Sequence, residues 1–188
     1  GLAHVGVLKW LEEHHIPLDY VAGTSMGGLV GGLYASGYDY QEMSEFISQI
    51  NWSEALQLST PFNDLTFRRK EDAVAFPNQL ELGLLHGIRL PPSLSSGNGV
   101  GLMISRFTSP YVGMKSFDDL PTSFRCVAVD LKTGKQFIFQ NGALFDALRS
   151  TMSLPGIFAP WKVGNEVFVD GGVLNNLPVD VAKNMGSD

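Results

Sequence analysis

One segment near the start of the chain constrains the fold more than any other. The apolar residues Tyr20–Ala22 have the composition of a short buried strand, and they lead directly into Gly-Thr-Ser-Met-Gly, from Gly23 to Gly27. The small residues from Gly28 to Ser36 then predict a tightly packed helix. A strand that turns into a helix through Gly-x-Ser-x-Gly is the context of a nucleophile elbow, which leaves Ser25 exposed at the helix N-terminus.

Two interpretations of Ser25 are open at this point. At a helix N-terminus, the dipole and the free backbone N–H groups favour the negative charge that develops when a serine attacks a carbonyl. Alternatively, the serine only caps the helix. Because a strand precedes the pentapeptide and a helix follows it, we favour the nucleophile, with Gly23 and Gly27 permitting the tight turn.

The rest of the chain predicts strands that alternate with helices. Further helices are expected over residues 1–15, 41–50, 98–107, 144–150 and 178–185. Strands are expected in two hairpins, one around His86-Gly87 and one over 124–139, and at Glu166–Val169, with a Pro-rich loop over 153–160. This order indicates a single α/β domain over 1–188, with a largely parallel sheet and with the hairpins as insertions or edge pieces.

Composition agrees with one globular domain and narrows the classes of partner. The 188 residues are 44% apolar and 17% charged, which suits a sizeable core. A net charge of −6 without a long basic run disfavours nucleic acid as a partner. Cys126 is the only cysteine, so no internal disulfide or thiol zinc cluster can form, and its strand context predicts a buried residue. No metal-ligating constellation stands out.

A serine nucleophile needs a base, and the histidines do not supply one in a suitable place. The chain contains His4, His14, His15 and His86. Only His86 follows Ser25, and it precedes every later candidate acid, whereas an α/β-hydrolase has the order Ser, Asp or Glu, His. A triad would therefore need a histidine beyond residue 188.

Asp170 is the best remaining candidate for the base. It ends an apolar strand and is followed by Gly171 and Gly172, which let the chain turn sharply. In an α/β sheet the carboxyl ends of parallel strands meet at one edge, so Asp170 could lie beside Ser25 and take its proton directly. An aspartate that only forms an Asx turn at the end of a strand carries about equal weight.

Ser25 in its elbow and Asp170-Gly171-Gly172, in this order and context, resemble the patatin-like phospholipase family, and the similarity covers nearly the whole chain. The stretch with Ser150, Ser153 and Pro155 resembles the family's loop that supports the active site. The middle of the chain resembles bacterial members, some of which are exported passengers fused to an outer-membrane barrel. The resemblance does not determine the compartment: a bacterial member could be exported or associated with the outer membrane, and otherwise the protein would be cytoplasmic or peripheral to a membrane.

The resemblance implies a three-layer α/β/α fold and lipid acyl hydrolysis by a Ser25–Asp170 dyad without a cofactor. The substrate would be a phospholipid or another lipid ester at a membrane surface. In the family a Gly-rich loop before the first helix supplies oxyanion donors, and here only Gly1 matches it, as its final glycine. We therefore expect the chain to lack its first strand and oxyanion loop and to be part of a longer enzyme.

Two other functions stay open. A catalytically silent lipid-binding or assembly module could keep the same fold, and an ordinary α/β-hydrolase could have its histidine downstream. The apolar residues of 89–107 could line an acyl-chain groove, although simple core packing is favoured.

Overall fold

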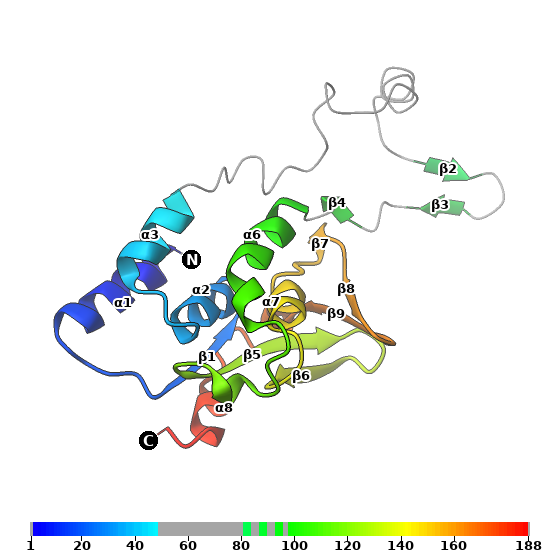
Figure 1. The fold of residues 1–188 in the computed structure, drawn as a ribbon. Helices are drawn as coiled ribbons and strands as arrows, with labels where there is room; N and C mark the ends of the chain where they lie inside the picture. Colours follow the sequence, from blue (N-terminus) through cyan, green and yellow to red (C-terminus); the bar gives the residue numbers. More distant parts are fainter. Residues whose placement is uncertain (1, 49–80, 84–86, 90–92, 96–97, 188) are drawn as a thin grey trace.

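A computed structural model describes residues 2–48, 81–83, 87–89, 93–95 and 98–187, which form an open sheet with helices around it (Figure 1). The helices are α1 (Leu2–Glu13), α2 (Met26–Ala35), α3 (Tyr40–Ser48), α6 (Asn98–Thr108), α7 (Leu144–Thr151) and α8 (Val179–Asn184). The strands are β1 (Tyr20–Thr24), β2 (Glu81–Gly83), β3 (Gly87–Arg89), β4 (Ser93–Ser95), β5 (Ser123–Asp130), β6 (Lys135–Phe139), β7 (Gly156–Phe158), β8 (Trp161–Val163) and β9 (Glu166–Asp170). Short 3-10 helices are η2 (Ser109–Tyr111), η3 (Phe117–Asp119) and η4 (Gly171–Val173).

The main sheet is built around β5, which has partners on both edges. β6 pairs with Cys126–Asp130 along one edge. On the other edge, β1 pairs in parallel with Ser123–Val127, and β9 pairs in antiparallel with Ala128–Asp130. Because β6 occupies one edge over Cys126–Asp130, β1 and β9 must share the opposite edge. Their carboxyl ends therefore meet head to head beside Val127 and Ala128.

The predicted α/β class is confirmed, but the expectation of a largely parallel sheet is wrong. In the described main sheet only β1 and β5 pair in parallel, whereas β6 and β9 pair with β5, and β8 with β9, in antiparallel. For the β5–β6 and β8–β9 pairs the physical reason lies in the connections. Turns at residues 131–134 and 164–165 join β5 to β6 and β8 to β9, and so short a connection can only produce an antiparallel hairpin.

Helices α2 and α7 pack closely on one face of the sheet, and α8 lies on the opposite side near β1 (Figure 1). A Cβ atom on Gly31 would lie 2.8 Å from Val21 Cγ1, and one on Gly32 would lie 2.8 Å from Leu148 Cδ2. These glycines therefore let α2 approach both β1 and α7. Cys126 is fully buried in the core, as predicted, and burial raises the pKa of its thiol.

The predicted positions of the helices and strands are largely confirmed. Where the structure describes them, their ends differ from the predicted ends by no more than two residues. The hairpin around His86-Gly87 is β2 and β3, which pair in antiparallel. The stretch over 153–160 is not only loop, because it contains β7, which pairs in parallel with β4. Within the described residues no helix is both long enough and apolar enough to cross a bilayer.

Candidate active site

Ser25 lies between the end of β1 and the start of α2 in a strained backbone conformation. Its φ is 57° and its ψ is −128°, and a non-glycine residue in such a region costs about 1–3 kcal/mol. The turn is so tight that a Cβ atom on Gly23 would lie 2.4 Å from the carbonyl oxygen of Gly27. Gly23 is therefore required by close approach. Gly27 has room for a side chain, since its nearest neighbour would be His4 Nε2 at 3.8 Å.

The hydroxyl of Ser25 donates a hydrogen bond to Asp170. The distance from Ser25 Oγ to Asp170 Oδ2 is 2.5 Å, typical of a hydroxyl bonded to a carboxylate. The other carboxylate oxygen, Oδ1, accepts the N–H of Gly172 at 2.7 Å, and the Asp170 N–H donates to the carbonyl of Ser153 at 2.9 Å. Asp170 is only 1% exposed. Its carboxylate is thus oriented by the backbone and has one oxygen directed at the serine.

The head-to-head arrangement of β1 and β9 explains why these two residues meet. Thr24, the last residue of β1, is opposite Val127, and Asp170, the last residue of β9, is opposite Ala128. Ser25 follows Thr24 directly, so the elbow and the aspartate share one junction on β5. The sequence predicted this proximity from parallel strands, whereas the structure achieves it with antiparallel β9.

The two glycines after Asp170 have different steric roles. A Cβ atom on Gly171 would lie 2.4 Å from the carbonyl oxygen of Val127, so the chain passes over the junction too closely for a side chain. A Cβ atom on Gly172 would lie 3.1 Å from both Asp170 Oδ1 and Asn176 Oδ1, which is tight but less severe. Both glycines therefore shape the backbone that orients the carboxylate.

Thr151, at the end of α7, contacts the elbow and was missed by sequence reasoning. Its Oγ1 accepts the N–H of Ser25 at 2.8 Å and donates to the carbonyl of Val127 at 2.6 Å. Asn175 was also missed, and its carbonyl accepts a hydrogen bond from Thr24 Oγ1 at 2.9 Å. Neither residue has a local sequence signal, because each contacts a segment that is distant along the chain.

The predicted supporting stretch lies against the site through Ser153. Its carbonyl holds Asp170, while its hydroxyl donates to the Arg149 carbonyl at 2.8 Å and accepts from Arg149 Nη1 at 3.0 Å. Arg149 is 1% exposed, and burial lowers the pKa of its guanidinium. Ser150 Oγ is buried without a hydrogen-bond partner among the described residues, and Pro155 is exposed.

The N-terminus of α2 supplies backbone donors beside Ser25. The N–H of Leu29 donates to the Ser25 carbonyl at 3.0 Å, so the N–H groups of Met26, Gly27 and Gly28 precede this first turn of helical bonding. Such groups, together with the helix dipole, favour a negative charge. Gly1, the one predicted residue of the oxyanion loop, lies outside the described residues.

The histidines divide into three groups. His4 was not predicted near the elbow, yet α1 brings its ring beside Gly27. His14 and His15 are exposed at the end of α1, as expected, with His14 stacked on Trp10 at 4.1 Å between ring centroids. His86 lies outside the described residues. No group of three or more metal-ligating side chains occurs within the described part of the chain.

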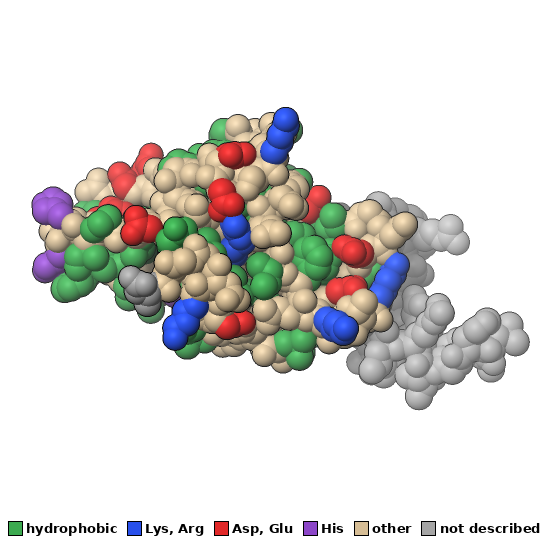
Figure 2. All heavy atoms as spheres, turned by 90° about the horizontal axis from the view of Figure 1, so that it is seen from below, with side chains coloured by type: hydrophobic (Ala, Val, Ile, Leu, Met, Phe, Trp, Pro, Cys, Tyr) green, Lys and Arg blue, Asp and Glu red, His purple; other side chains and the backbone are tan. Residues whose placement is uncertain are grey.

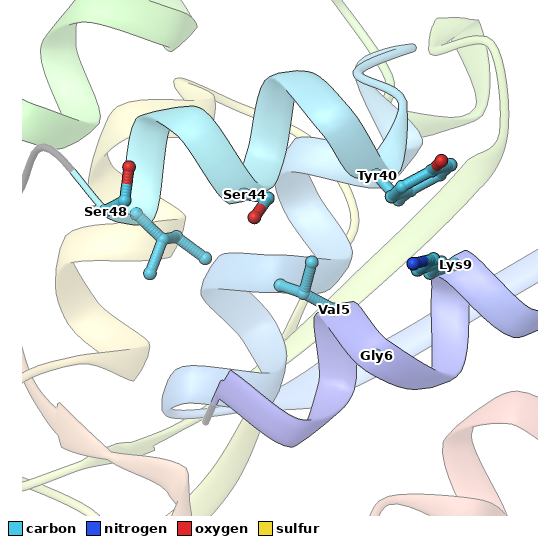
Figure 3. A pocket seen from close by; sticks show the side chains of 7 residues that line it. Val5, Gly6, Lys9, Tyr40, Ser44 and Ser48 are labelled. Atoms are coloured by element: carbon cyan, nitrogen blue, oxygen red, sulfur yellow. The ribbon is translucent and has the colours of Figure 1, made fainter.

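A cavity of about 510 Å³ lies between α1 and α3 (Figure 3). Val5 and Lys9 of α1 face Tyr40, Ser44 and Ser48 of α3 across it. Neither Ser25 nor Asp170 lines this cavity. The acyl-chain groove considered for 89–107 is not supported in the described part of α6, because Val100, Met103, Ile104 and Phe107 are buried in the core and, of its apolar residues, only Leu102 is exposed.

The open α/β sheet and the strained serine between β1 and α2 define a protein with nucleophile-elbow geometry. The patatin-like phospholipase family model matches residues 1–183. The chain therefore belongs to the patatin-like phospholipase family, and the predicted patatin-like fold is confirmed. Family membership supports a lipid hydrolase as the general class.

Three relatives illustrate the similarity. An uncharacterized NTE family protein of Mycobacterium bovis is 29% identical over 188 residues, which cover 100% of this chain and 44% of that protein. Lysophospholipase NTE1 of Debaryomyces hansenii is 27% identical over 193 residues, covering 100% of this chain and 10% of that protein. A patatin-like phospholipase domain-containing protein of Caenorhabditis elegans is 30% identical over 189 residues, covering 100% of this chain and 12% of that protein.

Among solved structures, VipD from Legionella pneumophila matches with a TM-score of 0.49 and 12% identity, covering 93% of this chain and 44% of that chain. The chain thus spans less than half the length of each of these known proteins.

Proposed function

We propose that the chain carries a serine lipid acyl hydrolase of the phospholipase A type, with Ser25 as nucleophile and Asp170 as general base. The observation that carries this proposal is the 2.5 Å hydrogen bond from Ser25 Oγ to Asp170 Oδ2. Family membership and the lysophospholipase among the relatives support a lipid ester as substrate. The chemistry needs no metal or organic cofactor, because the two side chains supply the nucleophile and the base.

In the acylation step Ser25 Oγ attacks the ester carbonyl carbon while its proton passes to Asp170 Oδ2. The carbonyl oxygen becomes an oxyanion, which the Met26 N–H and the dipole of α2 stabilise. When the oxyanion collapses, the ester C–O bond breaks. Asp170 then returns the proton to the leaving alkoxide, which departs as an alcohol, and the acyl group remains on Ser25.

In the deacylation step a water molecule attacks the acyl carbonyl and gives its proton to Asp170. Collapse of the second oxyanion breaks the bond to Ser25 Oγ and releases the fatty acid. Ser25 then regains its proton from Asp170, which restores the starting state. One water is consumed for each ester hydrolysed.

We propose that the hydrolysis takes place at a membrane surface. Val173 and Leu174 are 59% and 56% exposed, and Leu177 is 78% exposed. They lie within seven residues after Asp170, and between them the carbonyl of Asn175 accepts a hydrogen bond from Thr24, the residue before the elbow serine, so the segment adjoins the dyad. Seen from below, acidic and basic side chains are interspersed, with apolar side chains between them (Figure 2). Such a surface favours contact through apolar insertion over electrostatic attraction.

The test of the dyad combines hydrolysis with covalent labelling. Ser25→Ala and Asp170→Asn should each lower kcat for a soluble acyl ester and for phospholipid by more than about a thousandfold. A fluorophosphonate probe should label the wild type at Ser25. Ser105→Ala and Asp19→Asn are matched controls, because both residues are exposed, Ser105 on α6 and Asp19 in the loop before β1, and both variants should keep wild-type rates.

Two results would contradict the proposal. Full activity in Ser25→Ala would exclude the dyad. Absence of labelling and of hydrolysis in the wild-type whole protein would instead favour a lipid-binding module that keeps the fold without the chemistry.

A further inference from the structure

The N–H of Ser25 and the carbonyl of Val127 are both bonded to one buried hydroxyl. Thr151 Oγ1 accepts from Ser25 N at 2.8 Å and donates to Val127 O at 2.6 Å, and Thr151 is 0% exposed. Val127 is the β5 residue beside which β1 and β9 meet. The hydroxyl of Thr151 therefore lies at the junction that brings the nucleophile to the aspartate.

The direction of these bonds is determined by the chemistry of a hydroxyl. Threonine has one O–H hydrogen and two acceptor lone pairs. Because the hydrogen is directed to the Val127 carbonyl, the oxygen can only accept from Ser25. The N–H of the nucleophile is thereby held toward α7, which helps to retain Ser25 at its positive φ of 57°.

The same end of α7 also holds the other half of the dyad. Two residues after Thr151, the carbonyl of Ser153 accepts the N–H of Asp170 at 2.9 Å. The nucleophile and the proposed base are thus both anchored to residues 151–153, one through a side chain and the other through the backbone. A displacement of this turn would change the distance between Ser25 Oγ and the carboxylate.

We propose that Thr151 is a positioning residue for the hydrolytic reaction, which orients Ser25 by binding its N–H and anchoring it to Val127. This inference rests on the proposed function of Ser25. It also assigns one oxyanion donor. The Ser25 N–H already donates to Thr151, so the nearest backbone N–H along the chain that is not used in the hydrogen bonds of α2 is that of Met26.

The test compares Thr151→Val, which keeps the shape and removes the hydroxyl, with Thr151→Ser, which keeps the hydroxyl. Misplacement of a catalytic group by about 1 Å can cost about a hundredfold in rate. We therefore expect Thr151→Val to lower kcat and the rate constant of fluorophosphonate labelling by about 10–100-fold, with KM for a soluble ester unchanged. Thr151→Ser should recover most of the loss.

A matched control separates positioning from the general loss of a buried hydroxyl. Thr108 is also buried, and its Oγ1 donates to Ile104 O at 2.9 Å within α6. Thr108→Val should lower the melting temperature without changing the labelling rate of the remaining folded protein. If Thr151→Val does not fold, Thr151→Ala and Thr151→Ser form the comparison, because they differ only in the hydroxyl.

The outcomes distinguish this inference from the proposed function. If the wild type is not labelled, both are overturned. If the wild type is labelled and the hydroxyl-free variant reacts at the wild-type rate, only the role of Thr151 is overturned. Equal losses in the folded Ser variant and the folded hydroxyl-free variant would also overturn it, because restoring the hydroxyl would then recover none of the rate.

Discussion

At the scale of single residues, the candidate site depends on a few backbone segments that approach each other so closely that only glycine fits. Ser25 has a positive φ, and the backbone of Gly23 nearly touches the backbone of Gly27. Strain of this kind persists only where the surrounding structure holds it in place. Here the contacts that hold it come from the turn itself and from Thr151.

The two glycines of the pentapeptide should therefore differ sharply in their tolerance of a side chain. Gly23→Ala places a Cβ atom 2.4 Å from the Gly27 carbonyl oxygen and should lower the free energy of unfolding by at least about 3 kcal/mol. Gly27→Ala meets nothing closer than 3.8 Å and lies in a helix, where alanine is favoured over glycine by about 1 kcal/mol. Urea denaturation measures both variants. Equal destabilisation by the two would contradict the steric assignment.

At the scale of elements, the arrangement around β5 decides which side chains meet. The parallel strand β1 and the antiparallel strand β9 end at neighbouring residues of β5, and α7 closes the junction from one face of the sheet. A second contact joins η3 to the start of β5, where Arg125 Nη1 and Nη2 donate to the two carboxylate oxygens of Asp118 at 2.8 and 2.9 Å.

The link between η3 and β5 should weaken in acid. The hydrogen bond from Arg125 lowers the pKa of Asp118 below its ordinary value of 3.8. A carboxyl whose pKa is lower in the folded state stabilises the fold above its unfolded pKa and loses this contribution as the pH falls through the folded pKa. The wild type should therefore melt above Asp118→Asn at pH 7, with a small difference because the side chain is half exposed.

The same melting experiments at decreasing pH provide the check. The difference between wild type and Asp118→Asn should shrink below pH 3.8 and disappear once Asp118 is protonated in the folded state. Asp19→Asn is the control, since Asp19 is exposed in the loop before β1. A difference that stays constant across this range would show that the charge of Asp118 does not stabilise the link.

At the scale of the whole molecule, the dyad adjoins a group of exposed apolar side chains, while the net charge is −6. Because a protein with a net negative charge is repelled by anionic lipid, the proposed membrane contact would rely on apolar insertion. Val112 serves as a control position at the end of α2 opposite to Ser25. It is 85% exposed, and it follows Tyr111, whose hydroxyl donates to the Ser36 carbonyl just after α2 ends. That helix has 10 residues and is about 15 Å long.

Leu177→Asp should weaken membrane binding without harming the chemistry. Losing the burial of one leucine costs about 1.5–3 kcal/mol, so we expect at least about tenfold weaker binding to phosphatidylcholine vesicles, measured by sedimentation. Hydrolysis of a soluble ester should be unchanged. Val112→Asp should leave vesicle binding at the wild-type level. Equal loss of binding in both variants, or in neither, would contradict docking through the segment beside the dyad.

The residues of the elbow could be predicted because their signal is local. A strand, a Gly-x-Ser-x-Gly turn and a small-residue helix follow one another directly, and the structure has them in that order. Asp170 could be proposed from its place at the end of a strand, although the predicted reason for its proximity to Ser25 was wrong. Thr151, Asn175 and His4 could not be predicted, since each reaches the elbow across a large separation in the chain.

The sequence by itself determined the α/β class and most of the elements, and it singled out Ser25 and Asp170 as candidates, because periodicity, turn glycines and strand-to-helix order act over a few neighbouring residues. Only the tertiary structure decided that β9 runs antiparallel, that it meets β1 head to head, and that Thr151 holds the nucleophile. Those features depend on which edges and faces pack together. Such pairings join residues as far apart as Ala128 and Asp170, or Ser25 and Thr151, without leaving a local pattern.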